Sequence, residues 1–69
     1  MNRPSTAIEA VAYDEERRVL IIRFVGGATY TYLDVPLFEY AALMEAESLG
    51  GYVNRRIKPN YEVREGGEI

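Results

Sequence analysis

The strongest pattern in the chain is an apolar run at residues 18–25, RVLIIRFV, which is rich in β-branched side chains. Such side chains favour a β-strand, in which successive residues point to opposite faces of the sheet. A strand that is apolar on both faces is usually central, with protein covering each side. We therefore predict a central strand here. One of its faces carries Leu20, Ile22 and Phe24, and the other carries Val19, Ile21, Arg23 and Val25.

Two further strands are predicted beside it. Residues 8–13 are mostly apolar, and a polar turn separates them from the central strand. On the other side, Gly26-Gly27 predicts a tight hairpin, because the favoured two-residue turns need positive φ. Residues 28–33, ATYTYL, then form the return strand, with Tyr30 and Tyr32 on one face. The pattern therefore predicts a three-stranded antiparallel meander.

The pattern changes to a helical period near Pro36, a residue type that is favoured at the first position of a helix. Asp34 adds negative charge near the positive N-terminal end of this helix. From residue 36 to about residue 47, one apolar stripe is expected to pack on the sheet, and Glu39 and Glu45 fall outside it. The stripe consists of Leu37, Tyr40, Ala41, Met44 and Ser48.

A second, short helix is predicted for residues 52–57. Gly50-Gly51 is expected to break the first helix, and Pro59 to end the second. Ser48 most simply caps the second helix, because its hydroxyl can accept a hydrogen bond from a backbone N–H of the first turn.

The whole chain, residues 1–69, is expected to form one domain with its core at residues 7–63. Residues 61–63 are expected to be extended, and residues 64–69 to form a flexible tail. The order β-β-β-α-α, with both helices on one face of the meander, describes a small α+β domain.

The composition excludes several classes of site. The 69-residue chain contains no cysteine and no histidine, so Ser-His and Cys-His nucleophile pairs and the usual zinc sites cannot form. A catalytic carboxylate pair needs a pocket that separates the two pKa values. In a domain this small, the acidic residues are more simply solvated charges. We therefore expect no enzymatic activity, no cofactor and no metal.

No apolar run approaches the roughly 20 residues that a membrane-spanning helix needs. The N-terminal ten residues also lack the apolar core of a signal peptide. The expectation is a soluble, cytoplasmic protein without a membrane partner.

Charge is divided unevenly along the chain, although the formal net charge is only −3. Residues 34–48 contain four acids and no cation, whereas residues 52–61 contain three cations and no acid. Guanidinium groups bind phosphate, and tyrosines can stack on unpaired bases. The candidate nucleic-acid contacts are Arg55, Arg56 and Lys58 for phosphate, Tyr52 and Tyr61 for stacking, and Asn54 and Ser48 for a base or for the loop itself.

Simpler interpretations stand beside these. For the basic cluster alone, the favoured one is that the cations only solvate their helix or offset the acidic helix before it. The side chain of Asn54 is equally expected to bond the backbone of residues 48–51. Tyr30 and Tyr32 resemble the aromatic platform of sheet-based RNA binders. Core positions are favoured for them, because one apolar helix must cover one face of the sheet.

The combined spacing of these residues resembles the signature of the KTSC domain, a family named for its occurrence at the C-terminus of some lysyl-tRNA synthetases. The resemblance covers residues 8–61 and departs from the family pattern at Gly51, Val53 and Pro59. The matching residues are Ala46, Ser48, Gly50, Tyr52, Asn54, Ile57 and Tyr61, preceded by Tyr13-Asp14, Phe24, residues 27–32 and Val35-Pro36.

The resemblance implies a stand-alone accessory module that binds RNA or tRNA, with the basic and aromatic segment at residues 48–61 as its contact surface. A rival hypothesis is a protein-interaction module or a small homo-oligomeric accessory protein with no nucleic-acid role. In that case the acidic and basic segments would bind a partner protein or a second copy through complementary charge.

Overall fold

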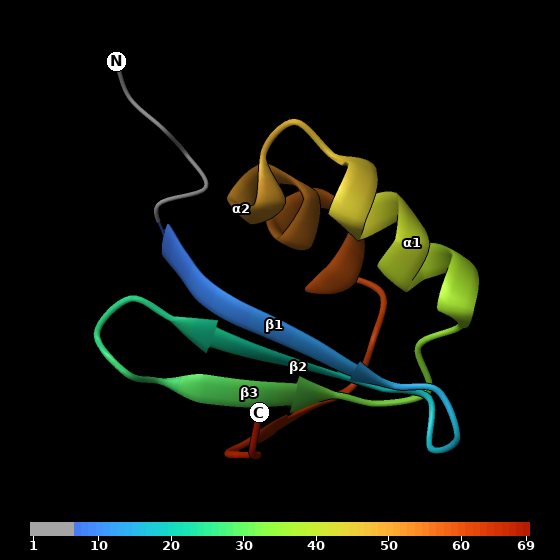
Figure 1. The fold of residues 1–69 in the computed structure, drawn as a ribbon, viewed down its shortest axis with the longest axis horizontal. Helices are drawn as coiled ribbons and strands as arrows, with labels where there is room; N and C mark the ends of the chain where they lie inside the picture. Colours follow the sequence, from blue (N-terminus) through green and yellow to red (C-terminus); the bar gives the residue numbers. More distant parts are fainter. Residues whose placement is uncertain (1–6) are drawn as a thin grey trace.

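The computed structural model describes residues 7–69, and the expectation that residues 1–6 hold no signal sequence lies outside this range. A four-stranded antiparallel sheet in the order β1-β2-β3-β4 carries all the helices on one face (Figure 1). The strands are β1 (Ile8–Asp14), β2 (Val19–Phe24), β3 (Thr29–Tyr32) and β4 (Val63–Glu65); the helices are α1 (Leu37–Glu45), α2 (Leu49–Tyr52) and the π-helical η2 (Val53–Ile57).

The predicted α+β class and the central position of β2 are confirmed. This strand pairs with β1 on one side and with β3 on the other. The hairpin that joins β2 to β3 turns at Gly26 and Gly27, whose φ angles are 104° and 102°. These angles lie in the region that glycine adopts without steric cost. The loop is longer than the expected two-residue turn, because Phe24 N donates to Ala28 O at 2.8 Å and leaves residues 25–27 between them.

The prediction of three strands is wrong, because residues 63–65 pair with the free edge of β3 as β4. The backbone continues this pairing on both sides, from Leu33 N to Glu62 O (2.8 Å) and from Gly66 N to Thr29 O (2.7 Å). All three side chains of β4 are exposed. Its stability comes from backbone hydrogen bonds, and no alternation of apolar residues marked it in the sequence.

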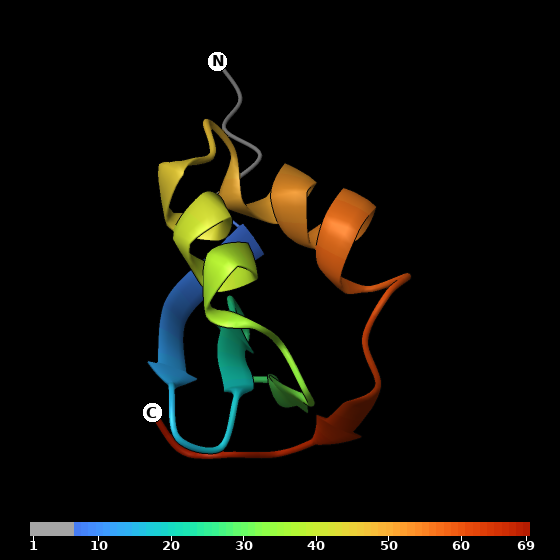
Figure 2. The ribbon, with the colours of Figure 1, turned by 90° about the vertical axis from the view of Figure 1, so that its right-hand side faces the viewer.

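The segment after β4 crosses the face of the sheet that has no helix (Figure 2). Thr31 Oγ1 donates a hydrogen bond to the Gly66 carbonyl at 2.8 Å. A Cβ atom at Gly67 would collide with Thr31 and would touch Ile21. The C-terminal segment therefore covers part of the second face of β2 and β3, which explains why that face also carries apolar side chains.

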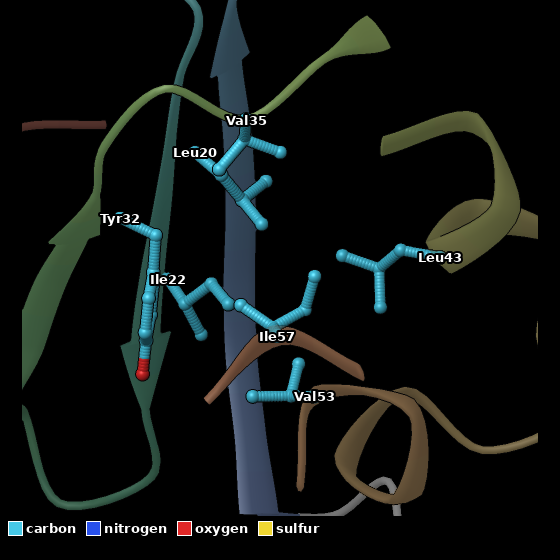
Figure 3. Packing of buried hydrophobic residues seen from close by; sticks show 7 residues of the cluster. All are labelled: Leu20, Ile22, Tyr32, Val35, Leu43, Val53 and Ile57. Atoms are coloured by element: carbon cyan, nitrogen blue, oxygen red, sulfur yellow. The ribbon is translucent and has the colours of Figure 1, made fainter. Parts of the chain in front are cut away.

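The hydrophobic core lies between the sheet and the helices. Tyr32 belongs to it, as the sequence favoured, whereas Tyr30 is only half-buried. The buried apolar side chains are Leu20, Ile22, Tyr32, Val35, Leu43, Val53 and Ile57 (Figure 3).

The predicted buried stripe of α1 is wrong. Leu37 and Met44 remain 48% and 42% exposed, and the two buried side chains of the helix are Glu39 and Leu43. Val35 is also fully buried, immediately before the helix. Glu39 and Leu43 are four residues apart, a spacing that keeps side chains on one side of a helix, and Val35 is buried in the segment that leads into the helix. The anchor at Val35 therefore sets the rotation of α1.

Aromatic contacts fix the same rotation. The rings of Tyr13 in β1 and Tyr40 in α1 are stacked, with centroids 4.8 Å apart and an angle of 9° between the planes. The hydroxyl of Tyr13 donates to the carbonyl of Val35 at 2.6 Å. Pro36 was expected to be the first residue of the helix. It is the N-cap instead, and the helix begins one residue later, at Leu37.

The second helix begins three residues earlier than predicted. Leu49 is its first residue, and Gly50 and Gly51 lie within it. Ser48 caps it as predicted: its Oγ accepts a hydrogen bond from Gly51 N at 3.0 Å. Gly50 is buried. A good cap and close packing at a buried position outweigh the roughly 1 kcal/mol that a helical glycine costs.

The chain passes from α2 into η2 without a break, and Lys58 N donates to Val53 O at 2.8 Å, which is the i to i+5 bond of a π-helix. Val53 and Ile57 are both buried on its inner side. Within the described residues, no helix has the length and apolar character that crossing a membrane requires.

Candidate functional site

Glu39 is the centre of a polar cluster that joins α1 to the rest of the helical layer. Its side chain is almost fully buried, with 1% of the residue exposed. The Tyr52 hydroxyl donates a hydrogen bond to Glu39 Oε2, and the Tyr61 hydroxyl donates to Oε1 at 2.7 Å. Arg56 Nε lies 3.5 Å from Oε2. A buried carboxylate is stable only when its charge is paired and its oxygens are bonded, and this cluster provides both.

The cluster keeps the carboxyl group ionised and the two phenols protonated. Burial alone would raise the pKa of Glu39, but the hydrogen bonds from Tyr52 and Tyr61 and the charge of Arg56 outweigh burial and lower it. Burial and the hydrogen bond to the carboxylate raise the pKa of Tyr61 to about 12. The same two causes raise the pKa of Tyr52. At neutral pH both hydroxyls are therefore hydrogen-bond donors to a fixed negative charge.

The cluster engages three of the seven residues that the sequence singled out for nucleic-acid contact. Tyr52, Arg56 and Tyr61 come together around Glu39. The two tyrosine hydroxyls point into the protein, whereas Arg56 pairs with Glu39 from a half-exposed position. Glu39 was not expected inside the protein, because the apolar stripe predicted for the helix ran through Leu37 and Met44. Its spacing of four residues from Leu43, on the same side of the helix, was the signal that could have placed it inside.

The other predicted residues lie elsewhere. Ser48 is half-buried and holds the start of α2. Asn54, Arg55 and Lys58 are exposed on η2 and at its end. Within residues 7–69, the side chain of Asn54 makes no hydrogen bond to the protein, and no acid lies within ion-pair distance of Arg55 or Lys58. Their polar groups are therefore directed to solvent.

Next to Lys58 the surface forms an aromatic groove that the sequence analysis did not identify. It has a volume of about 440 Å³ and lies between β2, β3 and β4 and the end of η2. The rings of Phe24 and Tyr30 meet edge to face in its wall, with centroids 5.9 Å apart and an angle of 67°. The residues that line the groove are Phe24, Ala28, Tyr30, Tyr32, Lys58 and Val63.

One charged residue, Lys58, lines the groove, and an acidic residue lies on the same face of the sheet nearby. Lys58 Nζ lies 5.6 Å from the centroid of the Phe24 ring, at a distance where a cation is attracted to an aromatic face. On the strand side, Glu65 is the partner of Tyr30 in the β3–β4 register, so both side chains emerge on the same face of the sheet. Among residues 7–69, no group of three or more acidic side chains is placed to hold a metal ion.

Comparisons with known proteins agree with the sequence resemblance. The family model of the KTSC domain matches residues 4–61. A protein of Tsukamurella paurometabola is 47% identical over 57 residues, which are 83% of this chain and 85% of that protein. A protein of Stutzerimonas stutzeri, described as uncharacterized, is 39% identical over 57 residues, covering 83% of this chain and 80% of its own length.

A solved structure has the same fold. The crystal structure of a KTSC domain protein from Yersinia pestis superposes with a TM-score of 0.84 at 34% sequence identity, covering 97% of this chain and 94% of the other. The family match spans most of the chain, and the relatives match it over most of their own length. The chain therefore belongs to the KTSC domain family.

Proposed function

We propose that this KTSC domain is a non-enzymatic module that binds single-stranded RNA, with phosphates on the exposed cations of η2 and one base in the aromatic groove. The observation that carries the proposal is the position of Lys58. It stands at the end of the basic surface of η2 and, at the same time, on the rim of the groove. A nucleotide has the same two parts, an anionic phosphate beside a flat aromatic base.

The phosphate side of the proposed site consists of Arg55 and Lys58. Both side chains are exposed and have no acidic partner in the described part of the chain. Arg56 shares its charge with Glu39, so its contribution to phosphate binding is smaller. Asn54, on the same helix, provides a neutral donor and acceptor for the sugar or for a base edge.

The base side is the groove. Its volume of about 440 Å³ falls in the range of small-molecule sites and exceeds what one base needs. Phe24 and Tyr30 offer ring faces and edges for stacking, an interaction worth about 1–3 kcal/mol per base on single strands. Glu65, across from Tyr30, offers a carboxylate that can accept a hydrogen bond from a base amino group.

This assignment changes the roles that the sequence suggested for two tyrosines. Tyr52 and Tyr61 donate their hydroxyls to Glu39 and hold η2 and the following segment against α1. They act as positioning residues, and the stacking role passes to Phe24 and Tyr30. Their effect on binding is indirect, because they fix the place of Lys58 relative to the groove.

Two further considerations support the proposal. KTSC domains at the C-terminus of some lysyl-tRNA synthetases lie beside an enzyme whose substrate is RNA. Single-stranded RNA exposes its bases, and recognition of unstacked bases on aromatic side chains is the common mode of sequence-dependent RNA binding. The proposal places the module in the cytoplasm, where RNA is available, and it requires no cofactor.

The test is a fluorescence anisotropy titration with labelled hexaribonucleotides at low and at moderate salt. With two phosphates in contact, the logarithm of the affinity should fall with the logarithm of salt with a slope of about −1.4. Lys58→Gln should weaken binding and reduce this slope by about 0.7. Arg64→Gln is the matched control, because this substitution also removes one positive charge and Arg64 lies on the opposite face of β4 from the groove.

A second pair of variants tests the base side. Phe24→Leu keeps an apolar side chain but removes a ring, and it should weaken binding about five-fold or more if a base stacks there. Phe38→Leu is its control, because Phe38 is 66% exposed on the helix α1 and does not line the groove. Equal binding by Lys58→Gln and the unchanged protein, or affinity that ignores salt, would contradict the proposal.

A further inference from the structure

The outward surface of α1 has an unusual distribution of side chains. Glu39 points into the protein, while three large apolar side chains of the same helix point out. Leu37, Phe38 and Met44 are 48%, 66% and 42% exposed. Ala41 is exposed between them. We call this surface, formed by Leu37, Phe38, Ala41 and Met44, the α1 outer face.

Its apolar character is not needed for folding. The core contact of the helix is made by Leu43, with Tyr40 stacked on Tyr13. Single exposed apolar residues are common, but several large ones on adjacent turns mark a contact surface. A polar outer face would leave the contacts of Leu43 and Tyr40 in place, so these side chains point to a role outside the domain.

The surroundings of the α1 outer face are acidic. Glu45 and Glu47 are exposed at its C-terminal end. The last turn of α1 contains no basic residue, although the negative end of the helix dipole lies there and favours cations. No lysine or arginine occurs between Arg23 and Arg55. The negative charge at this end is therefore not balanced within the helix, and it favours a partner that brings positive charge.

We propose that the α1 outer face docks a basic amphipathic helix of another protein. Apolar side chains of the partner would pack on Leu37, Phe38 and Met44, and its lysines or arginines would lie beside Glu45 and Glu47. Recognition of this kind, between an amphipathic helix and an apolar surface, is a recurrent mode of peptide binding. It uses a surface on the β1 side of the molecule, whereas η2 lies on the β4 side (Figure 2).

A second copy of the chain fits this surface less well. Two α1 outer faces brought together would offer no cation to Glu45 and Glu47 of either copy, because neither helix carries a lysine or an arginine. A stable dimer also buries about 800 Å² on each partner. That is close to a fifth of the 4499 Å² surface of this chain.

The experiment uses a synthetic 14-residue amphipathic helix built from leucine and lysine, and a second peptide in which glutamate replaces every lysine. Binding of each labelled peptide to the full chain is measured by anisotropy. The lysine peptide should bind and the glutamate peptide should not. The double variant Leu37→Ser/Phe38→Ser should weaken binding about ten-fold or more, as expected for central apolar contacts. Val25→Ser is the matched control, since Val25 is 64% exposed elsewhere.

The acidic end is tested separately. Glu45→Gln/Glu47→Gln should weaken binding of the lysine peptide and flatten its dependence on salt. Glu15→Gln/Glu16→Gln removes the same charge from the exposed turn between β1 and β2 and should have no effect. The four glutamates are exposed, so urea denaturation should give unchanged stability for these two double variants.

Three results would overturn the inference. The first is equal binding of the two peptides. The second is equal weakening by Val25→Ser and by the α1 variant. The third is a sedimentation experiment in which the unmodified chain dimerises with concentration and Phe38→Ser abolishes the dimer, which would assign the α1 outer face to a second copy.

Discussion

Replacing Glu39 by glutamine removes the central charge of the buried cluster while keeping the size of the side chain. In the native protein the carboxylate accepts hydrogen bonds from Tyr52 and Tyr61 and pairs with Arg56. A hydrogen bond to a charged group contributes about 1.5–3 kcal/mol and a neutral one about 0.5–1.5 kcal/mol. Two bonds that lose their charge therefore cost about 2–3 kcal/mol. The half-exposed Arg56 loses its partner as well.

This loss is large for a chain of 69 residues, whose total stability is expected to be about 3–10 kcal/mol. The assay is urea denaturation at pH 7, followed by circular dichroism. A lower midpoint with an unchanged slope reports a loss of native-state stability. For a domain of this size, the loss corresponds to a melting temperature lower by about 10–20 °C.

Glu45→Gln is the control, because Glu45 is exposed at the end of the same helix. Its effect should stay within about 0.5 kcal/mol, as for other surface substitutions. If Glu39→Gln were as stable as the control, the buried cluster would not hold the helical layer together, and the reasoning about the position of η2 would fail.

Three further predictions concern the dependence on pH, the cap of α2 and the packing of the C-terminal segment. The folded pKa of Glu39 is lowered, so the stability that this carboxylate contributes is present above its ordinary pKa of 4.5 and is lost as pH falls through the folded value. The folded pKa of Tyr61 is raised from 10.0 to about 12, so the stability that this phenol contributes is present below pH 10 and is lost as pH rises towards 12. Denaturation midpoints across pH should show both limbs. Tyr61→Phe should flatten the alkaline limb, and it should also reduce the acid limb, because the Tyr61 hydroxyl is one of the donors that lower the pKa of Glu39. Ser48→Ala removes the cap of α2 and should cost about 1 kcal/mol in urea denaturation, whereas Ser48→Asp should restore most of it. Gly67→Ala should lower the free energy of unfolding by about 1 kcal/mol or more, because the φ of 130° at Gly67 and its contact with Thr31 leave no room for a Cβ. Glu68→Ala is the control, since Glu68 is the exposed neighbour. Equal denaturation midpoints for the two variants would contradict the packing of the C-terminal segment on the sheet.

The sheet was predictable where side-chain pattern determines the structure. The apolar run predicted β2, because a strand that is buried on both faces requires apolar residues. The glycine pair predicted the turn after it, because positive φ favours glycine. The strand β4 was not predictable in this way. Its side chains are all exposed, and backbone hydrogen bonds to the edge of β3 hold it, which any sequence can provide.

The helices were also predictable only in part. The existence of α1 followed from its period, but its rotation did not, because the helix has apolar residues on two sides. The buried anchor at Val35 and the partners of Glu39 decide which side faces the sheet. These partners, Tyr52 and Tyr61, follow α1 in the chain, so their contact with Glu39 becomes visible only in the folded protein.

The candidate site was predictable in part. The charge pattern identified Arg55 and Lys58, which are exposed, and the cap at Ser48 is confirmed. The aromatic groove was not found, because Phe24 and Lys58 are distant in sequence and meet only when η2 ends above the sheet beside the unpredicted β4.

The central claim is that single-stranded RNA binds at Lys58 and the adjoining groove. The most direct measurement is an amide NMR titration of the chain with a hexaribonucleotide, at low and at moderate salt. We expect shifts in Phe24, Tyr30, Arg55 and Lys58 that fade as salt increases, with little change on α1. Electrostatic binding is strongest at low salt, so a spectrum that stays unchanged there, or shifts confined to α1, would contradict the account.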